Sequence, residues 1–165
     1  MTQFDTKLLR NAFGCFPSGV TIVTLTDSDN KPTGITVSSF SSLSLDPPLC
    51  LFSIGKEQAS RPLFETSSHF VVNVLCADQE SIAWQFAKPI EDKFENVSYT
   101  ENANGMPIIE GNIAHFCCKK WALYEGGDHI ILVGEVLDFN LSDSDALIFF
   151  KGKIASIANP HTTLK

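Results

Sequence analysis

The chain has 165 residues, which suits one domain over residues 1–165 that buries roughly two-thirds of its unfolded surface. Its formal net charge of −7 argues against nucleic acid or an anionic membrane as the main partner, since both require clustered Lys and Arg. Charged residues make up 19%, below the usual ~25%. That deficit favours a compact fold that hides additional surface, for example in a subunit contact.

The first half of the chain alternates helix and strand signals. Apolar residues recur on one side of an opening helix, and Gly14 and Pro17 bracket its end. Alternating β-branched and apolar residues on both sides of a turn then predict a hairpin. In chain order we expect a helix over residues 5–15, strands over 19–26, 34–39 and 48–54, and a short helix over 60–67 that Ser60 caps.

The second half is richer in strands. Asp78 is expected to cap a helix, and a helical turn follows it. A segment rich in Asn, Gly and Pro is predicted to be an irregular loop, and a glycine-rich tip joins two long strands. The expected elements are a strand over 69–75, a helix over 78–87, a turn over 89–96, a loop over 102–111 and strands over 113–124, 129–140, 146–150 and 153–157.

This order predicts a mainly β protein with short helices. Six to eight strands fit a closed antiparallel barrel, which leaves few exposed edges. The five cysteines form no C-x-x-C pair, so neither a disulfide framework nor a metal site is predicted. Reduced thiols in a cytoplasmic protein are expected instead. The start of the chain does not resemble a signal peptide, and no apolar run approaches ~20 residues.

One segment combines hydroxyl groups with apolar residues and indicates a ligand site. Residues 33–44 contain many Ser and Thr side chains, one glycine and no charge, which is too polar for a buried strand. Val37, Phe40 and Leu43 lie between the hydroxyls. Such a run can hold a phosphate, or a heteroaromatic ring with polar edges. The alternative is an ordinary Ser/Thr-rich strand end and loop.

Two further places carry candidate functional groups. Lys56 and Arg61 flank Ser60 at the start of a predicted helix, where free N–H groups and the helix dipole favour a phosphate. The alternative there is a solvated charged loop. His129 follows a Gly-Gly-Asp turn and opens an apolar strand, so it is expected at the barrel mouth with Asp128 holding one imidazole tautomer. A lone histidine at a strand start is otherwise more often a surface residue.

Five short segments follow one another in a fixed order between about residues 8 and 157. They are F-P-S-G-V-T at 16–21, T-V-S-S-F-S-S-L-S-L-D-P-P-L at 36–49, F-V-V-N-V-L at 70–75, D-K-F at 92–94, and G-D-H at 127–129 with Gly134 and Val136. This series resembles the flavin reductase-like family, small NAD(P)H:flavin oxidoreductases that supply reduced flavin to partner monooxygenases. The resemblance implies an FMN-binding split barrel with Greek-key antiparallel strands, usually a homodimer with flavin near the interface.

The resemblance also assigns expected roles to residues. It places the flavin phosphate at Lys56, Ser60 and Arg61, and the nicotinamide beside His129, with Asp128 as its orienting partner. Ser53 and Ile54 are expected to touch the cofactor through their backbone, and Phe94 is either a flavin neighbour or a core residue. The complete expected flavin-binding set is Pro17, Ser18, Gly19, Thr36, Val37, Ser38, Ser39, Ser42, Leu43, Ser53, Ile54, Lys56, Ser60, Arg61 and Phe94.

The implied activity is hydride transfer from NADH or NADPH to FMN or FAD. No G-x-G-x-x-G fingerprint is present, so nicotinamide is expected in a shallow groove over the flavin. Two departures leave alternatives open: Ser38 replaces a frequent asparagine, and Ile154 a frequent aromatic residue. The alternatives are an oxidoreductase with tightly bound FMN that reduces a ferric chelate or corrinoid, and a flavin-binding protein without catalysis.

Overall fold

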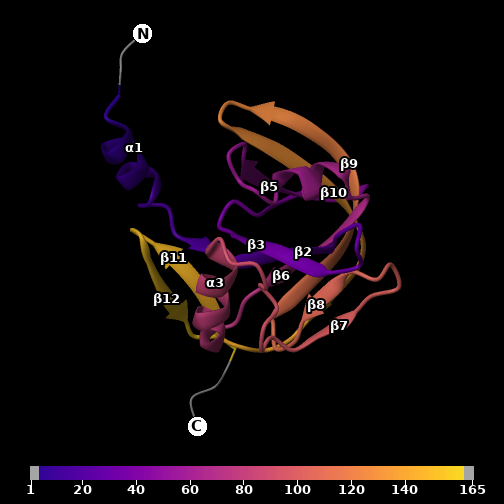
Figure 1. Cartoon of the computed structure of the whole chain (residues 1–165). Helices are drawn as coiled ribbons and strands as arrows, with labels where there is room; N and C mark the ends of the chain where they lie inside the picture. Colours follow the sequence, from indigo (N-terminus) through magenta and orange to yellow (C-terminus); the bar gives the residue numbers. More distant parts are fainter. Residues whose placement is uncertain (1–3, 162–165) are drawn as a thin grey trace.

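The structure, a computed structural model, describes residues 4–161. A seven-stranded antiparallel sheet forms its body, with the strand order β3-β2-β6-β9-β10-β5-β4 (Figure 1). Residues 38–40 alone join the two edge strands β3 and β4, so the sheet curls until these edges approach each other. The strands are β2 (Thr21–Thr26), β3 (Pro32–Val37), β4 (Ser41–Leu45), β5 (Pro48–Gly55), β6 (His69–Val74), β9 (Ala114–Gly126) and β10 (His129–Leu141).

Smaller elements surround this curled sheet. A second antiparallel sheet has the order β1-β11-β12, and β7 and β8 form a separate pair. Helix α3 lies between the β3 side of the large sheet and strands β11 and β12 (Figure 1). These elements are β1 (Ser18–Gly19), β7 (Tyr99–Glu101), β8 (Pro107–Ile109), β11 (Ala146–Phe150), β12 (Lys153–Ile157), α1 (Thr6–Phe13), α2 (Arg61–Thr66), the 3₁₀ turn η1 (Ala77–Gln79) and α3 (Glu80–Ala87). The predicted mainly β, antiparallel fold with short helices is thereby confirmed.

Two clusters of apolar side chains form the core. One fills the curled sheet, and β5 contributes Cys50, Phe52 and Ile54 to it, at alternate positions. Ser53 lies between two of these buried residues, and the two-residue period of a strand turns it to the opposite face. The second cluster packs the inner side of α3, through Ala83 and Phe86, against the barrel and β11. The same alternation that builds the core therefore presents polar groups on the other face of the sheet.

The structure corrects several sequence predictions. The hydroxyl-rich residues 41–45, for which no strand is predicted, form strand β4 at the edge of the sheet, where polar side chains are tolerated because the strand is largely exposed. The predicted loop 102–111 contains β8, which pairs with β7. Asp78 does not cap α3, since it lies in the preceding 3₁₀ turn and accepts a hydrogen bond from the Cys76 thiol. Residues 93–96 form a turn without a helix.

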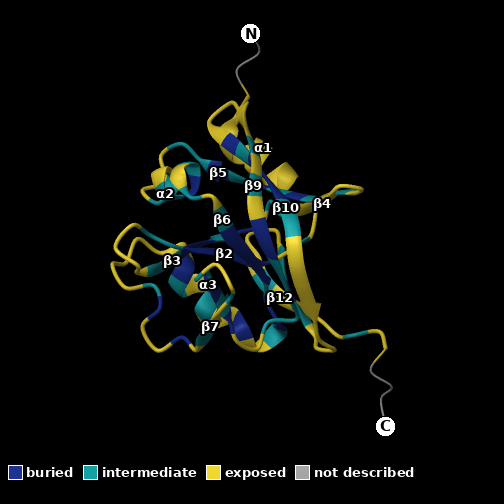
Figure 2. Cartoon of the chain, turned by 90° about the vertical axis from the view of Figure 1, so that its right-hand side faces the viewer, coloured by how far each residue is buried: buried dark blue, intermediate teal, exposed yellow. Residues whose placement is uncertain are grey.

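Helix α1 has no buried residue. Asp5 fixes its start by accepting hydrogen bonds from the backbone N–H groups of Lys7 and Leu8 at 2.8 and 3.1 Å. The apolar side that the sequence predicts is present but uncovered, with Leu8 68% and Phe13 71% exposed. Figure 1 shows the helix to one side of the curled sheet, and in Figure 2 it has the colour of exposed residues. Within residues 4–161, no helix has the length and apolar character needed to cross a membrane.

Candidate flavin and nicotinamide site

Residues 38–40, which join β3 to β4, present an unpaired stretch of backbone. The N–H groups of Ser38, Ser39 and Phe40 have no backbone acceptor within residues 4–161. Ser38 is exposed, and its hydroxyl makes no hydrogen bond in the same part of the chain. Backbone polar groups need a partner, so these donors are available to water or to a ligand with acceptor atoms. Residues 38–40, here called the split of the sheet, therefore carry free backbone donors beside a cavity.

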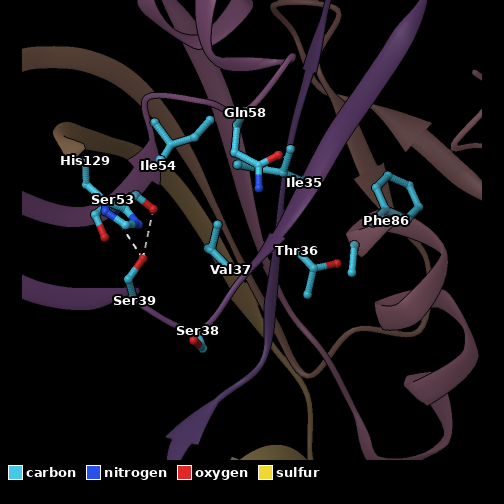
Figure 3. Close-up of a pocket in the computed structure, with 12 residues that line it drawn as sticks. Ile35, Thr36, Val37, Ser38, Ser39, Ser53, Ile54, Gln58, Phe86 and His129 are labelled. Carbon is cyan, nitrogen blue, oxygen red and sulfur yellow. Dashed lines mark hydrogen bonds between the residues drawn. The ribbon is translucent and has the colours of Figure 1, made fainter. Parts of the chain in front are cut away.

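A cavity of about 220 Å³, here called the polar pocket, opens beside this stretch (Figure 3). It lies where β3 approaches the ends of β5, β10 and α3. Figure 3 shows Ser39, Ser53 and His129 on one side of Val37, and Thr36 and Phe86 on the other. The lining comprises residues 35–39, 53–55, Gln58, Phe86, Ala87 and His129.

Two hydroxyls of the pocket also hold its walls together. Ser39 Oγ donates to the carbonyl of Ser53 at 3.1 Å and accepts from its backbone N–H at 3.0 Å, so it connects the split to β5 (Figure 3). Thr36 Oγ1 donates to the carbonyl of Ala83 at 2.6 Å, which connects β3 to α3. The oxygen of Thr36 can still accept a hydrogen bond from a ligand, whereas Ser38 can both donate and accept.

This difference gives a paired prediction for two adjacent serines. We expect Ser39→Ala to lower the free energy of unfolding by about 1 to 2 kcal/mol, because both backbone groups of half-buried Ser53 lose a partner. Ser38→Ala should change it by less than about 0.5 kcal/mol while weakening flavin binding. Urea titration of both variants measures the first effect, and flavin ultrafiltration the second. Equal unfolding free energies for the two variants would contradict the assigned roles.

His129 lies at the rim of the polar pocket, at the first position of β10. Its register partner is Gly55, and a methyl group added at Gly55 would sit 3.7 Å from His129 Nε2. Asp128 Oδ1 is 2.7 Å from Nδ1, as expected for an orienting carboxylate. The hydrogen bond from His129 lowers the pKa of the Asp128 carboxyl. The Asp128 carboxylate therefore stays ionised at neutral pH. Its hydrogen bond with His129 is lost only as the pH falls through the lowered pKa of Asp128.

A second cavity, here called the apolar hollow, shares Thr36, Val37 and Ser38 with the polar pocket. Its volume is about 170 Å³, and it lies between α3 and the strands β11 and β12. Phe149 and Ile154 are direct partners in that strand pair, and both line it. Position 154 holds isoleucine instead of the aromatic residue that is frequent in the family, and Phe149 on the neighbouring strand supplies an aromatic ring beside it. The polar pocket and the apolar hollow are therefore neighbours, which meet at their shared lining residues on β3.

Two of the three residues predicted to hold the flavin phosphate form ion pairs within the protein, and their phosphate role stays a prediction. Lys56 pairs with Glu125 on β9, and Arg61 with Glu65 at 3.2 Å within α2. Ser60 stands at the N-cap of α2, but its side chain makes no capping hydrogen bond because its backbone is already helical. None of these three residues lines the polar pocket, which instead receives Gln58 from the same loop.

Other predicted flavin residues fall outside both cavities. Ser18 and Gly19 form β1. Ser18 pairs with Phe149 and so lies next to the apolar hollow. Pro17, just before β1, is exposed. Ser42 and Leu43 belong to β4 and are exposed at the sheet edge. Phe94 is a core residue, packed edge-on against Phe86 and Tyr99 with centroid distances of 5.0 and 4.9 Å. Its side chain is therefore part of the core, and a flavin-binding role for Phe94 stays a prediction.

Several lining residues were not predicted from the sequence. Phe86, Ala87 and Trp84 come from α3, which docks on β3 through contacts that no local pattern reveals. Gln58 has no motif around it. The sequence did predict the helix with its apolar side, and such a side must pack against another element of the fold. It did not indicate which strand α3 packs against.

The comparisons with known proteins show the family of the chain. Residues 13–158 match the flavin reductase like domain, so the chain belongs to this family. It is 41% identical over 148 residues to the FMN reductase (NADH) SmoA of Agrobacterium fabrum, covering 90% of this chain and 84% of SmoA. It is 37% identical over 154 residues to the reductase subunit HsaB of a flavin-dependent monooxygenase from Rhodococcus jostii, covering 93% and 78%.

A solved structure gives the same result in three dimensions. The NADH:FAD oxidoreductase SgcE6 of Streptomyces globisporus, in complex with NAD and FAD fragments, superposes with a TM-score of 0.89 at 39% identity. The match covers 96% of this chain and 95% of SgcE6. Other curated relatives are longer, and this chain spans 48% to 65% of three of them.

Proposed function

We propose that this chain is an NAD(P)H:flavin oxidoreductase that reduces FMN or FAD and releases it to a partner monooxygenase. One observation carries the proposal: Ser38 and Ser39, whose N–H groups have no backbone acceptor within residues 4–161, line a pocket whose rim holds His129. The acceptor-rich pyrimidine edge of a flavin fits these donors, and Val37 offers an apolar surface for its ring. A bound flavin supplies the hydride acceptor, and the protein supplies binding and orientation.

His129 is the residue that we expect to position the nicotinamide. When Nδ1 carries the proton it donates to Asp128, which leaves Nε2 as an acceptor at the pocket rim. That atom can accept a hydrogen bond from the carboxamide N–H of a nicotinamide. Orientation of two stacked rings supplies much of the rate, so no strong general base is needed. His129 thereby acts through placement and not through proton transfer.

The relatives support the proposed hydride donor and the proposed partner. SmoA is described as an NADH-dependent FMN reductase and SgcE6 as an NADH:FAD oxidoreductase, which supports NADH as the donor here. HsaB is a reductase subunit of a flavin-dependent monooxygenase, which supports a separate oxygenase as the consumer of reduced flavin. A homodimer belongs to the same proposal, because a second copy would cover the apolar side of α1 and residues such as Phe16, which is 80% exposed.

The test is NADH oxidation at 340 nm as a function of added FMN. A diffusible flavin predicts a rate that rises with FMN and saturates. A protein that keeps its flavin, yet oxidises NADH only after a ferric chelate is added, would contradict the proposal and favour the bound-flavin alternative.

His129→Ala should lower kcat/KM for NADH by about 10- to 100-fold, because the nicotinamide loses an orienting contact. The side chain is 47% exposed, so the unfolding free energy should change little. His161→Ala removes another exposed histidine, which lines neither cavity, and should leave the rate unchanged. Loss of flavin affinity without a change in NADH kinetics would show that His129 serves the flavin and not the nicotinamide.

A further inference from the structure

The apolar hollow has almost no polar lining of its own. Apart from the hydroxyls of Thr36 and Ser38, which it shares with the polar pocket, its walls are apolar or aromatic: Val20, Val37, Trp84, Phe149 and Ile154. An apolar cavity of 150 Å³ is large enough to bind benzene, and this hollow measures about 170 Å³. Its size and chemistry therefore suit a single benzenoid ring.

The ring systems of the nicotinamide nucleotide and of the flavin differ in how well they suit the apolar hollow. A nicotinamide carries a polar carboxamide and gains a positive charge on oxidation, and an adenine has ring nitrogens and an amino group. Each would lose hydrogen bonds to water in an apolar hollow without replacing them. The dimethylbenzene end of a flavin has no polar atom. The two cavities are neighbours that share Thr36, Val37 and Ser38, so a flavin whose polar end lies at the polar pocket has the apolar hollow next to it.

Trp84 is well placed to form the wall of this hollow. It projects from α3, and its indole Nε1 donates to Glu80 Oε1 at 3.1 Å, one turn earlier on the helix. This bond restricts the ring, yet the residue remains 42% exposed. An aromatic surface that is held in place and still uncovered can stack on another aromatic ring.

We propose that Trp84 is a flavin-binding residue and that the apolar hollow receives the dimethylbenzene end of the flavin. This inference rests on the proposed function, because it assumes that a flavin binds with its pyrimidine edge at residues 38–40. It assigns the orientation of the ring: polar end at the split of the sheet, apolar end between α3 and β12. Trp84 then contributes affinity and orientation without taking part in hydride transfer.

The experiment measures the dissociation constants of FMN and of 7,8-didemethyl-FMN by ultrafiltration. For Trp84→Ala we expect FMN binding to weaken about tenfold, and binding of the analogue, which lacks the two methyl groups, to weaken less than about threefold. Trp121→Ala is the matched control, since Trp121 is the other tryptophan of the chain, is 53% exposed and lines neither cavity. It should leave both constants unchanged. Trp84→Phe should retain the discrimination between the two flavins, which separates ring contact from any folding defect.

The outcomes separate this inference from the proposed function. Wild-type protein that binds neither flavin would overturn both. Flavin binding that Trp84→Ala leaves intact, or weakens equally for FMN and its analogue, would overturn the inference alone. A raised KM for NADH with unchanged flavin constants would also overturn it, because the hollow would then hold the nicotinamide.

Discussion

Replacement of Gly134 by alanine is expected to destabilise the protein by about 3 kcal/mol or more. A methyl group at this position on β10 would lie 2.4 Å from Phe70 Cζ and 3.0 Å from Cys118 Cβ. Phe70 is 2% exposed and packs edge-on against Phe52, with 5.5 Å between the ring centroids, so it has little room to move. Overpacking of this kind costs about 1 to 3 kcal/mol and sometimes more. Urea denaturation of wild type and Gly134→Ala measures the difference.

Gly19→Ala provides the control for this prediction. Nothing lies within 4 Å of the position that its methyl group would occupy, and its backbone is not left-handed. We therefore expect a change below about 0.5 kcal/mol. Equal unfolding free energies for Gly134→Ala and Gly19→Ala would contradict the close packing of β10 against Phe70.

A second large loss of stability is expected for Asn73→Ala. Asn73 is fully buried on β6, and its amide donates to the carbonyl of Ile22 at 3.0 Å. Its Oδ1 accepts from the backbone N–H of Ile109 at 2.9 Å and from the amide of Asn112 at 3.2 Å. Truncation removes this partner from the buried backbone groups of Ile22 and Ile109, at a cost of about 1 to 3 kcal/mol for each, whereas Asn112 keeps its bond to the Ile109 carbonyl. The free energy of unfolding should fall by about 2 to 4 kcal/mol.

Asn140→Ala separates this network from a general effect of removing an asparagine. Asn140 is exposed on β10, and its side chain accepts only from the N–H of Leu141, which water can replace. We expect a loss below about 0.5 kcal/mol from the same urea titration. A small effect in Asn73→Ala would mean that β8 is held by other contacts.

The strands that the sequence predicts best are those whose two faces differ. Residues 48–54 were predicted from their apolar character and punctuation, and β5 occupies Pro48–Gly55 with alternating burial. The two long strands joined by a glycine-rich tip were found as β9 and β10. β4 was missed because an exposed edge strand needs no apolar pattern. β8 was missed because Pro107 and Gly105 signal a turn, while the hydrogen bond from Ile109 to Asn73 that anchors it is long-range.

Part of the candidate site was predictable because it lies in continuous motifs. Thr36, Ser39, Ser53 and His129 line the polar pocket as expected, and their binding roles stay predictions. The contribution of α3 was not predictable, since its docking on β3 depends on tertiary packing around Phe86. Pairing of Lys56 with Glu125, far away in the sequence, likewise cannot be read from the loop itself.

The most direct test of hydride transfer between the two ligands is anaerobic stopped-flow absorbance at 450 nm. The protein is mixed with FMN and either NADH or NADH carrying deuterium at both C4 positions. Rapid protein-dependent bleaching that deuterium slows severalfold is the predicted result, because the hydride moves directly from nicotinamide to flavin. Bound flavin that NADH does not bleach would contradict the account and leave a flavin-binding protein without this activity.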